Sequence, residues 1–410
     1  MSNVVVIGGG AAGMMAAYSA GMSGHTVTLI EKNEKLGKKI YITGKGRCNF
    51  TNACDVEDFF KNVVSNPKFL YSALYTFSPD AMIDFIENHG IRTKVERGSR
   101  AFPESDHASD VTKALEKGLK EYGVKILLNT TVKDVVIKDN IVSGVRLSDG
   151  TSIACDYAIV CTGGLSYQTT GSTGDGLKWA KKSGLTVTDV RPALVPLNCK
   201  ESYIMEMQGL SLKNVKLNIF NGSKKLYDSF GEMLFTHFGV SGPLVLSASS
   251  VIGKTLQETK SLKAFIDLKP ALSKEELDAR VLRDFNENMN KHLSSVLRGL
   301  LPASMVPVFI QLMEFDDSRQ INSITKEERG ILISLLKALP FTIVGLRDFK
   351  EAIITQGGVS VKEIDPSTMR CKNIQGLSFA GEVLDLDAFT GGFNLQIAWS
   401  TGYLAGLSLD

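Results

Sequence analysis

The stretch "VVVIGGGAAGMMAAYSAGMSGHTVTLIEK" (residues 4–32) places a glycine cluster between two apolar segments of different periodicity. Residues 3–8 form a continuous apolar, β-branched run, and residues 11–23 carry Ala and Met at helical density. Residues 26–31, "TVTLIE", are again strand-like. The stretch therefore predicts a β-α-β unit.

The glycines of this stretch follow the G-x-G-x-x-G spacing in the strand-to-helix context that makes the pattern informative. Gly8 permits the tight turn, Gly10 lets the backbone approach a pyrophosphate, and Gly13 permits close packing of the helix on the strand. Glu31 ends the second strand, where its carboxylate can accept hydrogen bonds from a ribose diol. The motif predicts a dinucleotide and leaves FAD and NAD open.

The composition is that of a globular protein with more than one packed unit. The chain has 410 residues, which is more than one hydrophobic core usually serves, and 43% of them are hydrophobic. Lys and Arg total 46 against 44 Asp and Glu, and no basic run with interleaved aromatics occurs, so we expect no nucleic-acid partner. The N-terminus lacks the pattern of a secretory signal, and no apolar stretch is long enough to span a bilayer. We therefore expect a cytoplasmic protein without a membrane partner.

Six cysteines without a C-x-x-C pair are too sparse for a disulfide scaffold, so we expect reduced thiols. Five scattered histidines give little support to a metal site, and we expect none.

Changes of pattern mark an insertion in the second half of the chain. "VRPALVPLN" (residues 190–198) contains two prolines and indicates a boundary. Residues 192–270 alternate like strands of a small barrel or sheet, and residues 273–338 are helical in pattern, with Ser273 and Thr325 as cap-like starts. The predicted domains are a dinucleotide-binding domain in two parts, 1–190 and 357–410, a β-barrel-like insert, 191–272 and 341–356, and a helical subdomain, 273–340.

Two later stretches favour FAD over NAD. "VCTGGLS" (residues 160–166) follows a predicted strand, where two-dinucleotide flavoproteins return across the adenine half. "GEVLDLDAFTGGFNLQIAWSTGYLAG" (residues 381–406) places Gly391 and Gly392 at a helix start. Reduced flavin carries negative charge near N1 and the C2 carbonyl, which the backbone N–H groups of a helix N-terminus stabilise. A nicotinamide needs no such device.

Several long motifs carry a resemblance to a known family. They are, in order, G-G-G-A-A-G, "LGKKIYITGKGRCNFTN", "RAFPESDHASDV", "TGGLSYQTTGSTGDG", "LFTHFGVSGP", "QGGVSVKEIDPSTMR" and "AGEVLDLDAFTGGFNLQIAWSTG". Over essentially its whole length the chain resembles the bacterial three-domain flavoproteins once labelled NAD(FAD)-utilising dehydrogenases. Aminoacetone oxidases and 3-dehydro-bile-acid delta-4,6-reductases are among the named activities of that family. The resemblance implies an α/β fold with a Rossmann-type FAD-binding domain of the two-dinucleotide-binding type, interrupted by a β-barrel-like and a helical subdomain.

The resemblance also implies which residues hold FAD. Those expected at the pyrophosphate and the adenosine are Gly8, Gly10, Ala11, Ala12, Gly13, Glu31, Lys32, Val132, Thr162 and Gly163. Those expected along the cofactor and at its ribityl and pyrimidine end are Lys38, Thr43, Gly44, Arg47, Cys48, Asn49, Gly381, Glu382, Gly392, Asn394 and Leu395. Ala388 departs from the family pattern, which more often has glycine at that position of the loop.

Catalytic residues are less clearly marked. His237, from the insert that must supply the substrate face, is a candidate proton donor, and Arg100 is a candidate for binding a carbonyl or carboxylate group. Cys48 and Cys54 are six positions apart, unlike the closer helical pair of disulfide reductases, so Cys48 is expected to pack beside the flavin.

We expect an FAD-dependent oxidoreductase that transfers a hydride between flavin N5 and a small-molecule substrate. The favoured reaction is NAD(P)H-dependent reduction of an activated C=C bond in a steroid-like or bile-acid-like enone. NADH or NADPH would enter by the substrate face, because residues 171–176, "GSTGDG", lack the preceding strand of a second nucleotide domain. The alternatives are an aminoacetone-type amine oxidase using O2 and a flavin-binding factor acting on RNA or a protein partner. The oligomeric state is not indicated.

Overall fold

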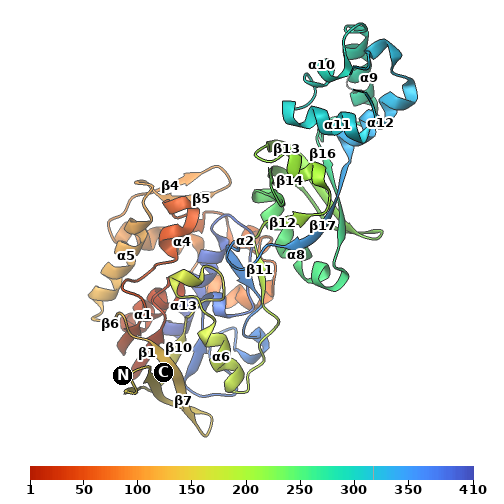
Figure 1. Ribbon diagram of the computed structural model, residues 1–410. Coiled ribbons are helices and arrows are strands. Elements are labelled where there is room, and N and C mark those ends of the chain that lie inside the picture. Colours follow the sequence, from red (N-terminus) through yellow and green to blue (C-terminus); the bar gives the residue numbers. More distant parts are fainter. Residues whose placement is uncertain (317) are drawn as a thin grey trace. The chain divides into compact units, whose positions relative to one another are not determined.

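A computed structural model describes residues 1–316 and 318–410 of the chain (Figure 1). Its central feature is a five-stranded parallel sheet in the order β19-β10-β1-β2-β6. The strands are β1 (Asn3–Ile7), β2 (Thr26–Ile30), β6 (Lys125–Leu127), β10 (Tyr157–Val160) and β19 (Leu377–Phe379). Four residues of β1 are buried, which is the reason for its continuous apolar sequence. The predicted β-α-β unit is confirmed, and the carboxyl ends of these strands share one edge, where α/β proteins bind ligands.

Helices α1 (Ala11–Met22) and α13 (Phe393–Leu407) pack against each other at backbone distance. A Cβ atom on Gly402 would lie 2.3 Å from the carbonyl oxygen of Ala12, and one on Gly406 would lie 2.2 Å from that of Ala16. Because residue numbers rise together in these two contacts, the helices run parallel. Phe393 precedes Gly402 by nine positions, so α13 begins roughly 13 Å before the level of Ala12 at 1.5 Å per residue.

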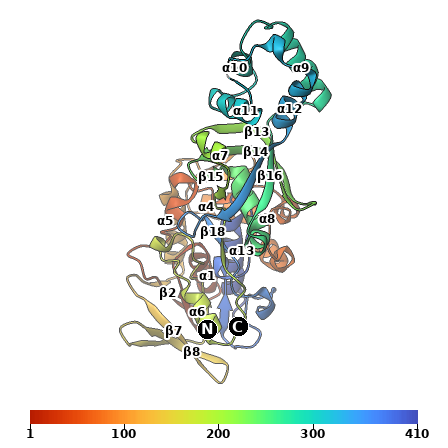
Figure 2. The same cartoon turned by 45° about the vertical axis from the view of Figure 1, so that its right-hand side comes forward.

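Further elements surround this core, and Figure 2 shows the β7–β8 hairpin extending from it. They are β3 (Thr51–Asn52), α2 (Val56–Phe60), α3 (Tyr71–Thr76), α4 (Pro79–Asn88), β4 (Thr93–Glu96), β5 (Arg100–Pro103), α5 (Ala108–Glu121), β7 (Val132–Lys138), β8 (Ile141–Leu147), β9 (Ser152–Ala154) and α6 (Asp175–Lys182). The turn between β7 and β8 has Asp139 and Asn140 at φ of 50° and 59°, as a tight hairpin requires. No helix among the described residues is long and apolar enough to cross a membrane.

The inserted segment contains a closed barrel in the order β12-β15-β14-β13-β16-β17. Its strands are β12 (Leu197–Cys199), β13 (Ser211–Asn221), β14 (Lys224–Thr236), β15 (Gly239–Ser241), β16 (Leu262–Asp267) and β17 (Leu339–Leu346), with the short helix α7 (Ser202–Glu206) beside them. The sequence analysis gave residues 192–270 strand pattern throughout, but α8 (Pro243–Thr259) is a helix whose apolar side is buried in the barrel core. Pro243 at its first position is a helix-start signal that the strand interpretation overlooked.

The helical part follows β16 and ends before β17. It comprises α9 (Lys274–Asn286), α10 (Leu293–Leu297), α11 (Val306–Leu312) and α12 (Lys326–Lys337). The two predicted caps are confirmed, because Ser273 with Glu276 and Thr325 with Glu328 each form a capping box.

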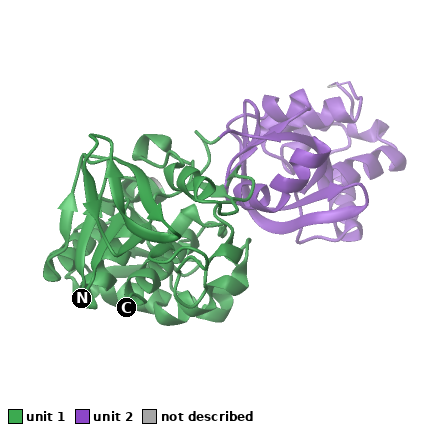
Figure 3. Ribbon diagram, turned by 90° about the horizontal axis from the view of Figure 1, so that it is seen from below, with its two compact units in different colours: residues 1–193, 349–410 green, residues 194–348 purple. Residues whose placement is uncertain are grey.

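The chain divides into two compact units, residues 1–193 with 349–410 and residues 194–348 (Figure 3). The sequence analysis assigned residues 191–193 and 349–356 to the insert, whereas this division places them in the first unit. The physical reason is that β11 (Arg191–Ala193) and β18 (Ile354–Gln356) pair antiparallel within that unit.

Candidate functional site

The glycine turn after β1 combines two tightly packed glycines with one that faces open space. A Cβ on Gly8, whose φ is +105°, would lie 2.5 Å from the carbonyl oxygen of Cys161, and one on Gly13 would lie 1.8 Å from that of Gly8. Gly10 has φ −83°, and no atom lies within 4 Å of the position a Cβ would take. Ala11 and Ala12 begin α1, which has no side-chain cap. The space before Gly10 and the free N–H groups of α1 suit a phosphate.

Glu31, directly after β2, is buried and held beside this turn. Its Oε2 accepts a hydrogen bond of 2.7 Å from the Gly9 N–H, and its Oε1 accepts from the N–H and the Nδ2 of Asn33 at 2.8 and 2.7 Å. Carboxylate oxygens have further lone pairs, so a ribose diol could still bind. Lys32 instead reaches the 171–176 loop, where its Nζ donates to Thr173 Oγ1 at 2.6 Å and pairs with Asp175 Oδ2 at 2.8 Å.

The loop after β2 contains a lysine that the sequence analysis did not single out. Lys39 Nζ lies 2.6 Å from Glu382 Oε2 and donates to Ser166 Oγ at 2.7 Å. The other oxygen of Glu382 accepts from Ser166 Oγ and from the Thr355 N–H, both at 2.8 Å. Lys38, the expected cofactor residue, pairs with Glu34 at 3.1 Å. The sequence "GKK" gives no signal for which lysine faces the site.

The start of α13 forms a second binding feature. Gly391 and Gly392 have φ of +125° and +98°, and α13 has no side-chain cap. Asn49 Oδ1 is buried without a hydrogen-bond partner among the described residues, and a Cβ on Gly392 would lie 3.0 Å from it. A buried acceptor without a donor costs about 1–3 kcal/mol, so a ligand that donates a hydrogen bond here would be favoured. The N3–H of an isoalloxazine is such a donor.

Cys48 precedes Asn49 at φ +59° and is fully buried. Burial raises the pKa of its thiol to about 12, and burial likewise raises that of Cys54 to about 11, so neither is a ready nucleophile. Both are free thiols, as are the other four cysteines.

The loop before α13 is fixed by Asn394 and contains a buried acid. Asn394 Oδ1 accepts from the Ala388 N–H at 2.9 Å, and its Nδ2 donates to the Ala388 carbonyl at 2.8 Å. Leu395 follows, half-buried. Asp387, which the sequence analysis did not select, is fully buried, and its Oδ2 accepts from Gln356 Nε2 at 3.0 Å. Burial raises the pKa of Asp387 to about 6.

Other expected cofactor residues have mainly backbone or packing roles. Thr162 Oγ1 accepts from the Gly176 N–H at 3.2 Å, and Gly163 has φ +69°. Gly381 donates its N–H to Thr401 Oγ1 at 3.0 Å. The remaining three are Val132, buried at the start of β7, Thr43, which donates to the Ile40 carbonyl at 2.7 Å, and Gly44, at φ +57° in the 3-10 helix Ile40–Gly46.

The two candidate arginines, Arg47 and Arg100, lie near the same aromatic ring, that of Phe102. Arg47 pairs with Glu96 and, at 2.7 Å, with Asp106, and its guanidinium is 4.3 Å from the centre of the Phe102 ring. These carboxylates raise the pKa of Arg47. Its guanidinium lowers the pKa of Glu96, and hydrogen bonds from Lys94 and then from Arg47 lower the pKa of Asp106. Arg100 is exposed and 5.9 Å from the same ring. Arg47 thus has acid partners within the protein, and Arg100 is the more open of the two.

His237 lies in the turn between β14 and β15 of the second unit. Its ring is exposed and lies 4.9 Å from that of Phe238 in an edge-on arrangement. The structure shows no further partner for the His237 side chain among the described residues, and its part in proton transfer stays a prediction.

Comparison with known proteins identifies the family. The family model described as "HI0933-like protein Rossmann domain" matches residues 2–408. The chain belongs to this family. It is 33% identical over 413 residues to a 3-dehydro-bile acid delta(4,6)-reductase of Clostridium scindens, covering 99% of this chain and 98% of that protein.

Two further relatives of this chain are ribosomal RNA dihydrouridine synthases. The protein from Haemophilus influenzae is 33% identical over 413 residues, covering 100% of this chain and 98% of the relative, and that from Escherichia coli is 31% identical over 412 residues, covering 99% and 98%. Among solved structures, the 3-ketosteroid-delta4-(5alpha)-dehydrogenase of Rhodococcus jostii is similar in fold, with a TM-score of 0.53 at 13% identity over 99% of this chain and 96% of that one. The family is one of FAD-dependent oxidoreductases, as the sequence analysis expected.

Proposed function

We propose that the first unit binds FAD in an extended form between the two helix starts. Glu31 would hold the adenosine ribose, the turn at Gly10 the pyrophosphate, and the start of α13 with Asn49 the pyrimidine ring. Three observations support this assignment: the open space at Gly10, the unpartnered Asn49 Oδ1, and the offset of roughly 12 Å between the starts of α13 and α1. When bound, FAD supplies the site that accepts and donates hydride.

We infer that the reaction is reduction of a C=C bond conjugated with a carbonyl group, with NADH or NADPH as electron donor. One observation carries this inference: relatives named for different substrates share that bond type. A delta(4,6)-reductase saturates such bonds in a 3-oxo steroid skeleton, and dihydrouridine is uridine saturated at C5–C6, next to the C4 carbonyl.

Of the two substrate classes, we place the uracil ring of RNA first and the steroid-type enone second. RNA is favoured because full-length relatives from two organisms carry that name, whereas the bile-acid name comes with one. The net charge of +2 supports the opposite expectation, that nucleic acid is not a partner, and that expectation stays untested. No feature of residues 1–316 and 318–410 favours the amine oxidase.

The test uses the purified holoprotein without oxygen. NADH or NADPH should bleach the flavin absorbance, and either ribosomal RNA transcribed in vitro or a 3-oxo-Δ4 steroid should restore it. Mass spectrometry of the digested RNA should then show uridine with two added hydrogens. Restoration by the steroid alone would support the second class. Bleaching by amines but not by NADH or NADPH would refute the reductase.

A further inference from the structure

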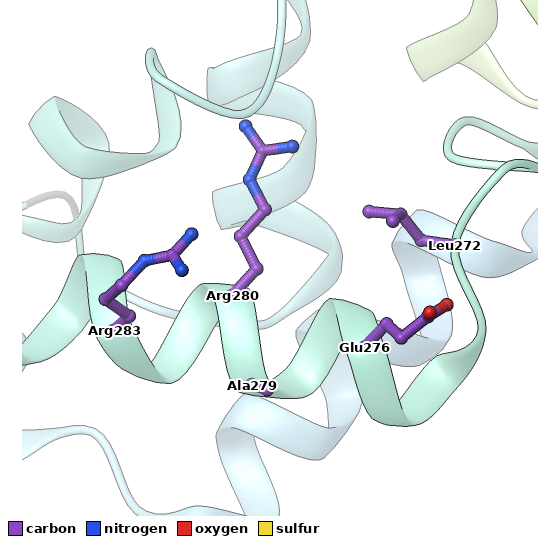
Figure 4. Close-up of a pocket in the computed structure, with 5 residues that line it drawn as sticks. All are labelled: Leu272, Glu276, Ala279, Arg280 and Arg283. Carbon is purple, nitrogen blue, oxygen red and sulfur yellow. The ribbon is translucent and has the colours of Figure 1, made fainter.

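A hollow of about 480 Å³ lies on the helical part of the second unit (Figure 4). Four lining residues, Glu276, Ala279, Arg280 and Arg283, come from α9, and Leu272 comes from the loop before it. Figure 4 shows the guanidinium groups of both arginines extending to the same side of α9. The hollow therefore presents two planar cations beside a small apolar surface.

The cations of this hollow have few acid partners. Arg283 has no ion pair or hydrogen bond from its side chain to any described residue, and Arg280 Nε is 4.0 Å from Asp284 Oδ2, at the limit for an ion pair. The single acid in the lining, Glu276, serves the capping box, where its Oε2 accepts from the Ser273 N–H at 2.8 Å. Lys269 is not in the lining of the hollow, and its pKa is lowered by burial and then by Arg280.

The loop that carries Leu272, just before α9, is held in place by buried contacts. Lys337 Nζ donates to the carbonyl oxygens of Lys269 and Leu272 at 3.0 and 2.7 Å, and it pairs with Asp267 at 2.7 Å. Both members of that ion pair are largely buried. Because the loop is tied to α12 and β16 in this way, the hollow exists before any ligand binds, and binding would cost little ordering of the backbone.

We propose that this hollow binds a backbone phosphate of the RNA substrate, which rests on the RNA candidate of the proposed function. Guanidinium groups bind phosphate oxygens through paired N–H donors, and here Arg283 lacks an internal partner while Arg280 has only the long ion pair with Asp284. An open hollow along a helix admits a polymer that continues at both ends, whereas a closed pocket would select a free nucleotide. The contact would position the RNA without reading its sequence.

The test measures binding of a fluorescently labelled ribosomal RNA fragment to the holoprotein by anisotropy, without NADH or NADPH. The variant Arg280→Gln with Arg283→Gln should weaken binding at least tenfold and should reduce the slope of log affinity against log salt by about 1 to 2. The matched control is Lys291→Gln with Arg298→Gln, which removes two exposed charges of the same subdomain outside the hollow. The control should change affinity less than threefold.

Three outcomes decide the proposal. Equal losses for the hollow variant and the control, in protein with an unchanged flavin spectrum, would overturn it. Restored affinity in Arg280→Lys with Arg283→Lys would show a charge effect alone, without paired donation, and would overturn the guanidinium assignment. If the wild type binds no RNA, the proposal and the RNA candidate both fail, whereas bleaching by NAD(P)H and reoxidation by steroid would still support the reductase.

Discussion

Replacing Gly402 by alanine tests whether the contact between α1 and α13 sets the geometry of the cofactor site. The new Cβ would lie 2.3 Å from the carbonyl oxygen of Ala12 and 3.0 Å from its carbonyl carbon and Cα. These are backbone atoms that no side-chain rotation can move away. The helices must therefore separate by roughly 1 Å to restore a normal contact.

The expected cost follows from two opposing terms. Overpacking of this kind costs about 1–3 kcal/mol, while alanine in a helix interior is about 1 kcal/mol better than glycine. We expect a net loss of about 0–2 kcal/mol from the stability of the first unit. A shifted α13 would also misplace its N–H groups, and a loss of about 1.4 kcal/mol there corresponds to tenfold weaker FAD binding.

Gly330 provides the matched control, because it lies in the exposed interior of α12 with no atom within 4 Å of the position of a Cβ. Gly330→Ala should stabilise the second unit by about 0.5–1 kcal/mol. Urea unfolding followed by circular dichroism reports both units, and flavin fluorescence reports release of FAD from the first. If Gly402→Ala stabilises the protein as Gly330→Ala does and keeps its FAD affinity, the helix contact does not constrain the site.

Three other perturbations give distinct expectations. Gly10→Ala should change the stability of the FAD-free protein by no more than about 0.5 kcal/mol relative to the wild type, because the new Cβ meets no atom. The same variant should bind FAD more weakly in a fluorescence titration. An unchanged FAD affinity would show that the pyrophosphate binds elsewhere. Lys39→Gln should lower FAD affinity about tenfold, because it releases Glu382 from its ion pair. Lys38→Gln loses only a surface ion pair with Glu34 and should change FAD affinity little. A larger loss of affinity in Lys38→Gln than in Lys39→Gln would favour Lys38 as the cofactor residue, as the sequence analysis expected. The pKa of Asp387 is raised from 3.8 to about 6, so the stability it contributes is full below pH 3.8 and is lost as pH rises through 6. In the wild type, the free energy of unfolding measured in urea should fall between pH 4 and pH 7 by an amount on the order of 3 kcal/mol because of this group, and Asp387→Asn should abolish that fall. If the wild type and the variant lose stability in parallel over this pH range, the raised pKa of Asp387 is contradicted.

Local signals in the sequence predicted the local structure well. The β-α-β unit, the two capping boxes and the hairpin at Asp139 depend on residues within a few positions of one another, where spacing and backbone preference decide the conformation. The helix α8 was missed because its β-branched and small residues resemble a buried strand, and only Pro243 indicated otherwise.

Pairings between distant residues could not be predicted. Arg47 was expected beside FAD, yet its acid partners Glu96 and Asp106 are 49 and 59 positions away. The partner of Lys39 is Glu382, 343 positions away, and neither residue carries a local pattern that indicates the other. Such pairs depend on how strands and loops meet in the folded chain, which periodicity does not encode.

The connection between the units explains how one cofactor site could serve different substrates. The inserted residues 194–348 leave the first unit after β11 and return before β18, and these two strands pair with each other. Changes within the insert therefore need not disturb the sheet order or the contact between α1 and α13 that positions the two helix starts. The hollow lined by Arg280 and Arg283 on α9 is the proposed RNA contact, and it lies in the insert. If the insert carries the substrate surface, relatives can differ in substrate and still share the proposed reduction of a C=C bond. Grafting the helical part of the C. scindens relative onto this chain should then change RNA affinity and leave flavin reduction by NADH or NADPH unchanged, and a changed rate of reduction would show that the two units are coupled.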